Sequence, residues 1–138
     1  MIKFRIFPEQ NFLVVCNWGE TSMEETLKLR KIIRANLDFS KSYDAIIDNT
    51  HLENYFSSKD IGILSNDQLG KNLPPSKVAI IAPTDIAFGM NRMYEMLTEI
   101  DNPMQMYVFR DRNEAITWLG RDIAEVEKII GEIMKEAE

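Results

Sequence analysis

The hydrophobic positions along the chain change their spacing repeatedly, and each change predicts a separate element. Residues 2–7 follow a period of two, which is typical of a half-exposed β-strand. Residues 12–16 and 78–82 are uninterrupted apolar runs, as expected of strands that are covered on both faces. Short apolar segments at residues 45–47 and 106–109 complete a set of five predicted strands.

Helical segments lie between these strands, and polar capping residues mark where they start. Ser22 and Glu25 form a capping box, in which a serine oxygen and a glutamate satisfy free amides at a helix start. Residues 57–60 open a second helix and residues 83–85 cap a third. A short fourth helix covers residues 111–119 and ends at a glycine.

The spacing of apolar residues predicts which helix faces are buried. The first helix is expected to bury Leu27, Ile32, Ile33 and Leu37 and to leave Lys28, Arg30, Lys31 and Arg34 in solvent. In the third helix one apolar set falls at i, i+4, i+7 and i+11, namely Ile86, Met90, Met93 and Leu97. Both faces of that helix carry large apolar groups. One face is therefore expected to cover the sheet, while exposed methionines on the other meet a partner or an apolar ligand.

Strands that alternate with helices predict an α/β fold with a mainly parallel sheet and with residues 2–7 as an edge strand. Residues 1–120 are expected to form one domain, because no repeat or long linker divides them. Residues 121–138 predict an additional acidic helix. Its apolar seam is spaced 4-3-4-3-4 and consists of Leu119, Ile123, Val126, Ile130, Ile133 and Ala137. The seam needs cover, either from its own sheet or from the second subunit of a homodimer.

Composition and charge narrow the classes of partner. The 138 residues are 45% hydrophobic and 28% charged, as in an ordinary globular domain. The net charge of -6 argues against a nucleic-acid partner, because phosphate backbones need a concentrated Lys/Arg surface. No segment has the pattern of a signal peptide or the length of a membrane span, so a cytoplasmic protein without integral membrane association is expected. The single cysteine, Cys16, fits a reducing compartment.

Residues with catalytic potential are few. Asp48, Thr50 and the only histidine, His51, lie at the carboxyl end of a predicted strand, where open α/β sheets place their ligands. They would suit acid–base chemistry or part of a metal site, but they supply two metal ligands at most, and solvated loop residues are the simpler interpretation. No phosphate-binding glycine loop or Gly-x-Ser-x-Gly motif occurs, and Cys16 lies in an apolar run. We therefore expect no enzymatic activity, no metal and no cofactor.

Two segments carry a resemblance to a known family. Residues 82–97 read APTDIAFGMNRMYEML, and residues 108–120 contain VFRD, EA and WLG. These segments, and the order of elements from Ile2 to Gly120, resemble the SpoIIAA-like family of small bacterial proteins in the STAS/Sec14-type superfamily. The resemblance implies a four- or five-stranded sheet backed by helices. It also implies a non-catalytic regulatory module that docks to a protein partner, as STAS anti-sigma factor antagonists do.

In the best understood members of that superfamily, docking is switched by phosphorylation of a serine at the start of the helix after the third strand. Ser58 and Ser57 match that position and are the phosphoacceptor candidates, whereas Phe56 and Lys59 replace the acid and the glycine of the switch turn. A phosphate there would meet free backbone amides and Lys59. The alternative is that one serine only caps the helix.

Two classes of function remain open. The first is the protein-interaction module, with or without the phospho-switch. The second is a small binding protein for an apolar metabolite or lipid, by analogy with the Sec14 side of the superfamily. The candidates for the ligand or partner surface are Asp48, Thr50, Thr84, Asp85, Phe88, Met90 and Tyr94.

Overall fold

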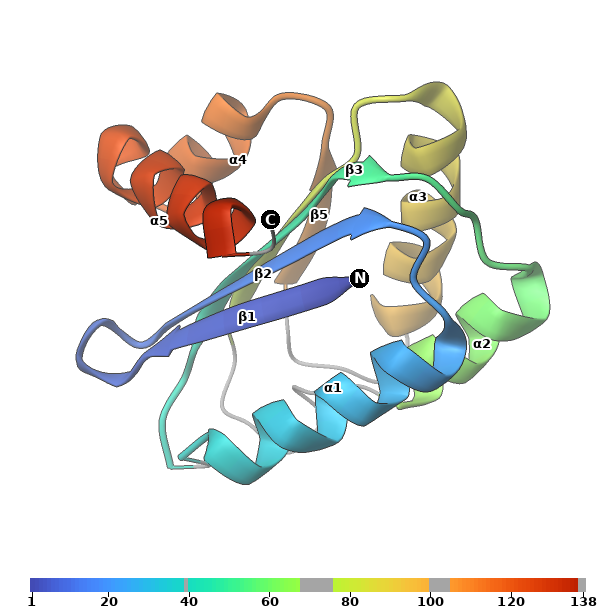
Figure 1. Cartoon of the computed structure of the whole chain (residues 1–138), viewed down its shortest axis with the longest axis horizontal. Coiled ribbons are helices and arrows are strands. Elements are labelled where there is room, and N and C mark those ends of the chain that lie inside the picture. The colour runs from blue at the N-terminus through green and yellow to red at the C-terminus, as the bar shows by residue number, and fades with distance from the viewer. Residues whose placement is uncertain (39, 68–75, 100–104, 137–138) are drawn as a thin grey trace.

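A single sheet forms the centre of the molecule in the computed structural model, which describes residues 1–38, 40–67, 76–99 and 105–136 (Figure 1). Its five strands lie in chain order, with β1 antiparallel to β2 and the remaining neighbours parallel. The strands are β1 (Ile2–Phe7), β2 (Phe12–Gly19), β3 (Asp44–Leu52), β4 (Lys77–Ile81) and β5 (Gln105–Phe109). The predicted α/β fold, with residues 2–7 as an edge strand, is confirmed.

Helices cover both faces of the sheet (Figure 1). One face carries α1 (Met23–Asn36), α2 (Ser58–Asn66) and α3 (Asp85–Glu99), and the other carries α4 (Arg112–Trp118) and α5 (Ile123–Glu136). A 3-10 turn at Pro8–Gln10 reverses the chain between β1 and β2 and ends at Asn11, which has a left-handed φ of 51°.

Side-chain caps position the helices on the first face, as the sequence predicts. The hydroxyl of Ser22 accepts a hydrogen bond from the amide of Glu25 at 3.0 Å, and that of Ser57 accepts one from Asp60 at 3.2 Å. At the start of α3 the hydroxyl of Thr84 accepts from the backbone amide at position 87 at 3.2 Å. Each cap satisfies an amide that has no partner within its own helix.

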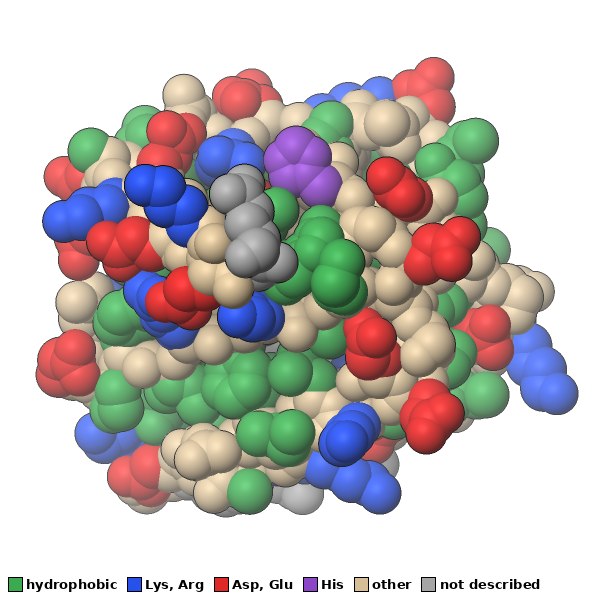
Figure 2. Space-filling model, in the orientation of Figure 1, with side chains coloured by type: hydrophobic (Ala, Val, Ile, Leu, Met, Phe, Trp, Pro, Cys, Tyr) green, Lys and Arg blue, Asp and Glu red, His purple; other side chains and the backbone are tan. Residues whose placement is uncertain are grey.

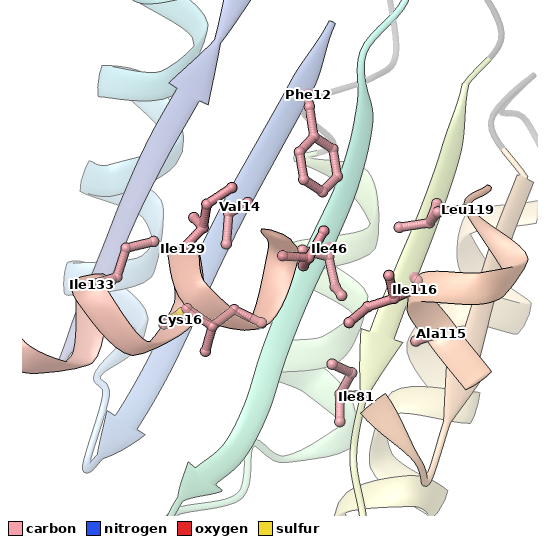
Figure 3. Packing of buried hydrophobic residues seen from close by; sticks show 13 residues of the cluster. Phe12, Val14, Cys16, Ile46, Ile81, Ala115, Ile116, Leu119, Ile129 and Ile133 are labelled. Atoms are coloured by element: carbon pink, nitrogen blue, oxygen red, sulfur yellow. The ribbon is translucent and has the colours of Figure 1, made fainter. Parts of the chain in front are cut away.

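The second face carries a core of buried hydrophobic side chains (Figure 3). The predicted seam of α5 lies against the molecule's own sheet, where Ile130 and Ile133 pack with Phe12, Val14 and Cys16. The seam differs from expectation at two positions, and a third is not tested. The buried set includes Ile129, Ile123 is 37% exposed, and Ala137 lies outside the described residues.

The apolar set of α3 that falls at i, i+4, i+7 and i+11 is mostly exposed. Ile86, Met93 and Leu97 are 63%, 42% and 39% exposed, while a polar stripe of Asn91, Glu95 and Thr98 is buried together with Ala87. The helix is turned so that Asn91 meets Asn49 of β3 across the layer. Asn91 finds hydrogen-bond partners on this buried face, whereas Glu95 Oε1 and Thr98 Oγ1 have none among the described residues. Hydrophobic spacing alone therefore did not determine the rotation of this helix.

Two further expectations need correction. The strand predicted at residues 45–47 is longer, and Asp48 and Thr50 lie inside β3, where Asp48 pairs in register with Cys16 and Ile81. On α1, Ile32 is exposed and Arg30 is half-buried, the reverse of the expected placement. In both cases polar groups find partners inside the fold, which local spacing does not reveal.

Candidate functional site

Two neighbouring cavities lie between the sheet and helices α1, α2 and α3. The larger has a volume of about 120 Å³ and is lined mainly by aliphatic side chains of β1 to β5 and α1, so we call it the apolar cavity. The smaller has a volume of about 80 Å³, reaches α2 and α3, and combines apolar with amide and hydroxyl side chains, so we call it the mixed cavity. Native interiors contain few spaces of this size, which makes this layer a candidate site.

The apolar cavity has an apolar rim. Ile2 of β1 and Leu29 of α1 both line it, and both are half-buried. Figure 2 shows hydrophobic side chains gathered between these two elements on the face that it views. Deeper in the layer, Val15, Ala45 and Val78 supply the sheet side of the cavity.

The two cavities share a wall. Five residues line both of them: Asn17, Thr26, Arg30, Ile47 and Tyr94. This wall brings one charged, one phenolic, one hydroxyl and one amide side chain to the junction of the cavities. A ligand that occupied the apolar cavity would therefore have polar groups at one end.

Arg30 is the charged member of the shared wall, and neutral groups hold it in place. Its guanidinium donates to the backbone carbonyls of Leu64 at 2.7 Å and Asp67 at 2.6 Å, and to the hydroxyl of Tyr94 at 2.9 Å. It also lies over the Tyr94 ring, 5.6 Å from the centroid. The Asp67 carboxylate is bonded to Arg34 instead, at 2.7 Å.

A chain of side-chain amides crosses the mixed cavity from the sheet to α3. Asn17 donates to Asn49 at 2.7 Å, Asn49 donates to Asn91 at 3.3 Å, and Asn91 donates to the backbone carbonyl of Ala87 at 2.7 Å. Asn49 and Asn91 are buried. Because each amide has a partner, the chain fixes the rotation of α3 over the sheet.

Of the surface candidates predicted from the sequence, two line the cavities. Tyr94 lies in the shared wall, and Met90 lines the mixed cavity, where its sulfur accepts a hydrogen bond from the amide of Phe56 at 3.2 Å.

Three other candidates gather around Arg110 at the start of α3. The Arg110 guanidinium is 2.6 Å from the Asp85 carboxylate and 4.5 Å from the Phe88 ring centroid, and Thr84 caps the helix beside them. Asp85 and Thr84 are exposed, so this group is a surface ion pair and helix cap that lies outside the lining of both cavities.

Asp48 and Thr50 belong to the opposite layer of the molecule. The Asp48 carboxylate accepts from the amide and hydroxyl of Thr50 and from Arg112 of α4 at 3.1 Å. Nearby, burial raises the pKa of the Cys16 thiol to about 12, and the Asp48 charge adds to the shift. Cys16 is therefore a protonated thiol of the packed core at neutral pH.

The remaining predicted groups stand apart from the cavities. Ser57 is the N-cap of α2, Ser58 is exposed at its first turn, and His51 is exposed near the end of β3. Within the described parts of the chain, no three His, Cys, Asp or Glu side chains gather closely enough to hold a metal ion. Among the helices of the described residues, none combines the length and hydropathy that a membrane crossing requires.

The local sequence pattern did not predict the polar residues of this layer. Asn17 directly follows the buried apolar run of β2, and Asn49 interrupts β3, which is a signal that a polar partner lies across the sheet. Arg30 follows Leu29 on the same helix, and no local signal distinguishes it from a solvated arginine.

Comparison with known proteins supports a fold assignment. No protein-family model matches the chain, and a search of curated proteins gives no significant match. Among solved structures, the chain is similar to an uncharacterised protein of the DUF3478 family from Shewanella loihica PV-4, which is described as having a SpoIIAA-like fold. The TM-score is 0.55 at 22% identity, over 86% of this chain and 93% of the other. The five-stranded, mostly parallel sheet with its two helical layers is thus a SpoIIAA-like fold.

Proposed function

We propose that the protein is a non-catalytic binding protein whose ligand is a small, largely apolar molecule held between the sheet and α1. The observation that carries this proposal is the apolar cavity of about 120 Å³. Residues from five strands and from the two helices α1 and α3 line it, so it is a feature of the whole layer.

The volume of the cavity allows an estimate of the free energy that a ligand gains by filling it. Unfilled volume in a closed interior costs about 24 cal/mol per Å³, so about 3 kcal/mol is the upper limit for this cavity, which opens to the surface at its rim. A ligand that fills the space recovers part of that cost in addition to the transfer of its own apolar surface from water. An engineered cavity of roughly 150 Å³ that is lined by aliphatic and aromatic side chains binds benzene.

The lining also supports a non-catalytic role. Among the described residues that line the two cavities, none is a His, Cys, Lys, Asp or Glu. These are the side chains that most often act as general bases or activate a nucleophile, so the hydroxyl groups of Tyr43, Tyr94 and Ser76 have none of them beside them in the described lining. The chemistry of the lining is that of a site that encloses a molecule and orients one polar end of it.

A neutral probe tests this proposal. We expect 1-octanol to bind to the wild-type protein in a calorimetric titration and to raise its melting temperature. Ala45 lines the apolar cavity, so Ala45→Leu should weaken binding at least tenfold. Ala35→Leu makes the same change at an exposed position of α1 and should leave binding unchanged. Absence of octanol binding, or equal binding by the Ala45→Leu protein, would contradict the proposal.

A second candidate function is the protein-interaction module that the family resemblance implies. The observation that favours it is the exposed apolar side of α3, where Ile86 and Met96 are 63% and 60% exposed beside Met93 and Leu97. Contiguous exposed apolar groups of this kind are common at protein interfaces. A purified protein partner that binds the wild type and loses affinity for Met96→Glu, with octanol binding unchanged, would support this function. A partner indifferent to Met96→Glu would argue against this surface.

Regulation by phosphorylation belongs to the same candidate function. Ser58 is exposed in the first turn of α2, and Lys59 follows it, so a phosphate there would meet the positive end of the helix dipole. Phosphopeptide mass spectrometry on residues 56–59 should find the modification in cells. A partner whose affinity is the same for the wild type and Ser58→Asp would exclude a switch at this position.

A further inference from the structure

We propose that the bound molecule is a carboxylic acid whose ionised headgroup pairs with Arg30 while its apolar body lies in the apolar cavity. This inference rests on the proposed binding function and adds the chemical class of the ligand. The position of Arg30 makes the pairing feasible, because its side chain lines both cavities at their shared wall.

Arg30 differs from the other arginines of the chain in its ion pairing. The chain has seven arginines, and six of them form an ion pair with a described carboxylate. Arg30 forms none within the parts of the chain that the structure describes. Even Arg34, one turn along α1, is bonded to the Asp67 carboxylate at 2.7 Å. Arg30 thus carries a half-buried positive charge that the described residues do not neutralise.

The groups that hold Arg30 orient it without neutralising it. Two carbonyls and the Tyr94 hydroxyl accept three of its five N–H donors. The other two donors have no acceptor among the described residues and are available to a ligand. A half-buried cation loses much of its hydration, so an anion in the adjoining cavity gains more from pairing than it would in water. Charge-assisted bonds to a planar guanidinium are the strongest that such an acceptor can form.

The charge count indicates a monoanion. A single positive charge that no described carboxylate neutralises matches one carboxylate of a ligand, whereas a phosphate monoester carries between one and two negative charges at pH 7. The apolar cavity adjoins Arg30 on the wall that contains Ile47 and Tyr94, so an aliphatic chain attached to the carboxylate can enter it directly. A medium-chain fatty acid is the simplest molecule with these features.

The experiment compares four eight-carbon probes by calorimetric titration at pH 7: octanoate, 1-octanol, octylammonium and octyl phosphate. We expect octanoate to bind at least tenfold more tightly than 1-octanol, since a hydrogen bond to a charged group contributes at least that factor. Octylammonium should bind more weakly than 1-octanol, and octyl phosphate no more tightly than octanoate.

Two arginine variants complete the test. Arg30→Gln should bind octanoate and 1-octanol with equal affinity, while Arg30→Lys should keep a preference for octanoate. Arg34→Gln is the matched control, because Arg34 also contacts Asp67 but lines neither cavity, and its preference should equal that of the wild type. If Arg30→Gln fails to fold, the four probes on the wild type and on Arg30→Lys decide the question.

Different results would contradict the carboxylate inference and the proposed binding function. Equal wild-type affinities for octanoate and 1-octanol would overturn the carboxylate inference and leave the proposed function intact. A preference for octanoate over 1-octanol that persists in Arg30→Gln would likewise overturn the inference that Arg30 binds the carboxylate. Tighter binding of octyl phosphate than of octanoate would overturn the choice of a carboxylate over a phosphate. If none of the four probes binds, the proposed function itself fails.

Discussion

Replacing Ala45 with leucine should stabilise the protein, although most substitutions in a buried core destabilise it. Ala45 lies in β3 and lines the apolar cavity, so the added carbons extend into available space. Ala79 provides the matched control. It lies in the neighbouring strand β4, is fully buried in the packed layer beneath α4 and α5, and lines neither cavity.

The expected magnitudes follow from burial and packing. Three additional carbons contribute about 2.4 kcal/mol at about 0.8 kcal/mol each, and the lost rotamer freedom of leucine costs about 0.5–1 kcal/mol. Ala45→Leu should therefore raise the free energy of unfolding by about 1.5 kcal/mol, which is about 5 °C in melting temperature for a domain of this size. Ala79→Leu should lower the free energy of unfolding by about 1–3 kcal/mol, because its surroundings are already filled.

Both variants can be compared with the wild type by urea and thermal unfolding followed by circular dichroism. The proteins should be refolded from denaturant first, so that no bound molecule stabilises the wild type alone. A result in which Ala45→Leu destabilises the protein as much as Ala79→Leu would refute the reasoning. It would mean that the space beside Ala45 closes in solution and cannot hold a ligand.

Three further predictions concern the second layer. Because its pKa is raised to about 12, the Cys16 thiol should resist dithiobis(nitrobenzoate) at pH 8 until urea unfolds the protein. The free energy of unfolding should also fall as the pH rises from 9 to 12, since in that range the thiol ionises only in the unfolded protein. Rapid labelling of the native protein would contradict both the resistance to the reagent and this pH dependence. Arg112→Met should lower the free energy of unfolding, measured in urea, by about 3–5 kcal/mol, because it leaves the buried Asp48 carboxylate without its ion-pair partner. Adding Asp48→Asn to the same chain should restore part of that free energy. A loss below about 1 kcal/mol for Arg112→Met would show that the pair is not buried in solution. Ile130→Ala should lower the free energy of unfolding by about 2–5 kcal/mol, and Ile123→Ala should lower it by under about 1 kcal/mol. Equal losses in the two variants would mean that α5 packs against the sheet with a different face.

The order of elements and most of their starts could be predicted from the sequence, because they depend on residues close together in the chain. Ser22 and Ser57 cap helices through amides three residues away, so the capping pattern is visible locally. The apolar runs of β2 and β4 have no polar face, which requires cover on both sides and hence helices in two layers. The SpoIIAA-like resemblance rested on the same kind of local pattern.

The candidate site depends on contacts between residues far apart in the chain, and only the tertiary structure decided these. The rotation of α3 follows from the bond between Asn49 and Asn91, which are 42 positions apart. Arg30 reads as a solvated arginine in sequence, yet in the fold its partners are 34 to 64 positions away and none of those contacts is a carboxylate. Hydrophobic spacing reports how much of a helix must be covered. The residues of the other layers that lie opposite a helix decide which of its polar groups are buried. They also decide which charge beside a cavity has no carboxylate partner among the described residues.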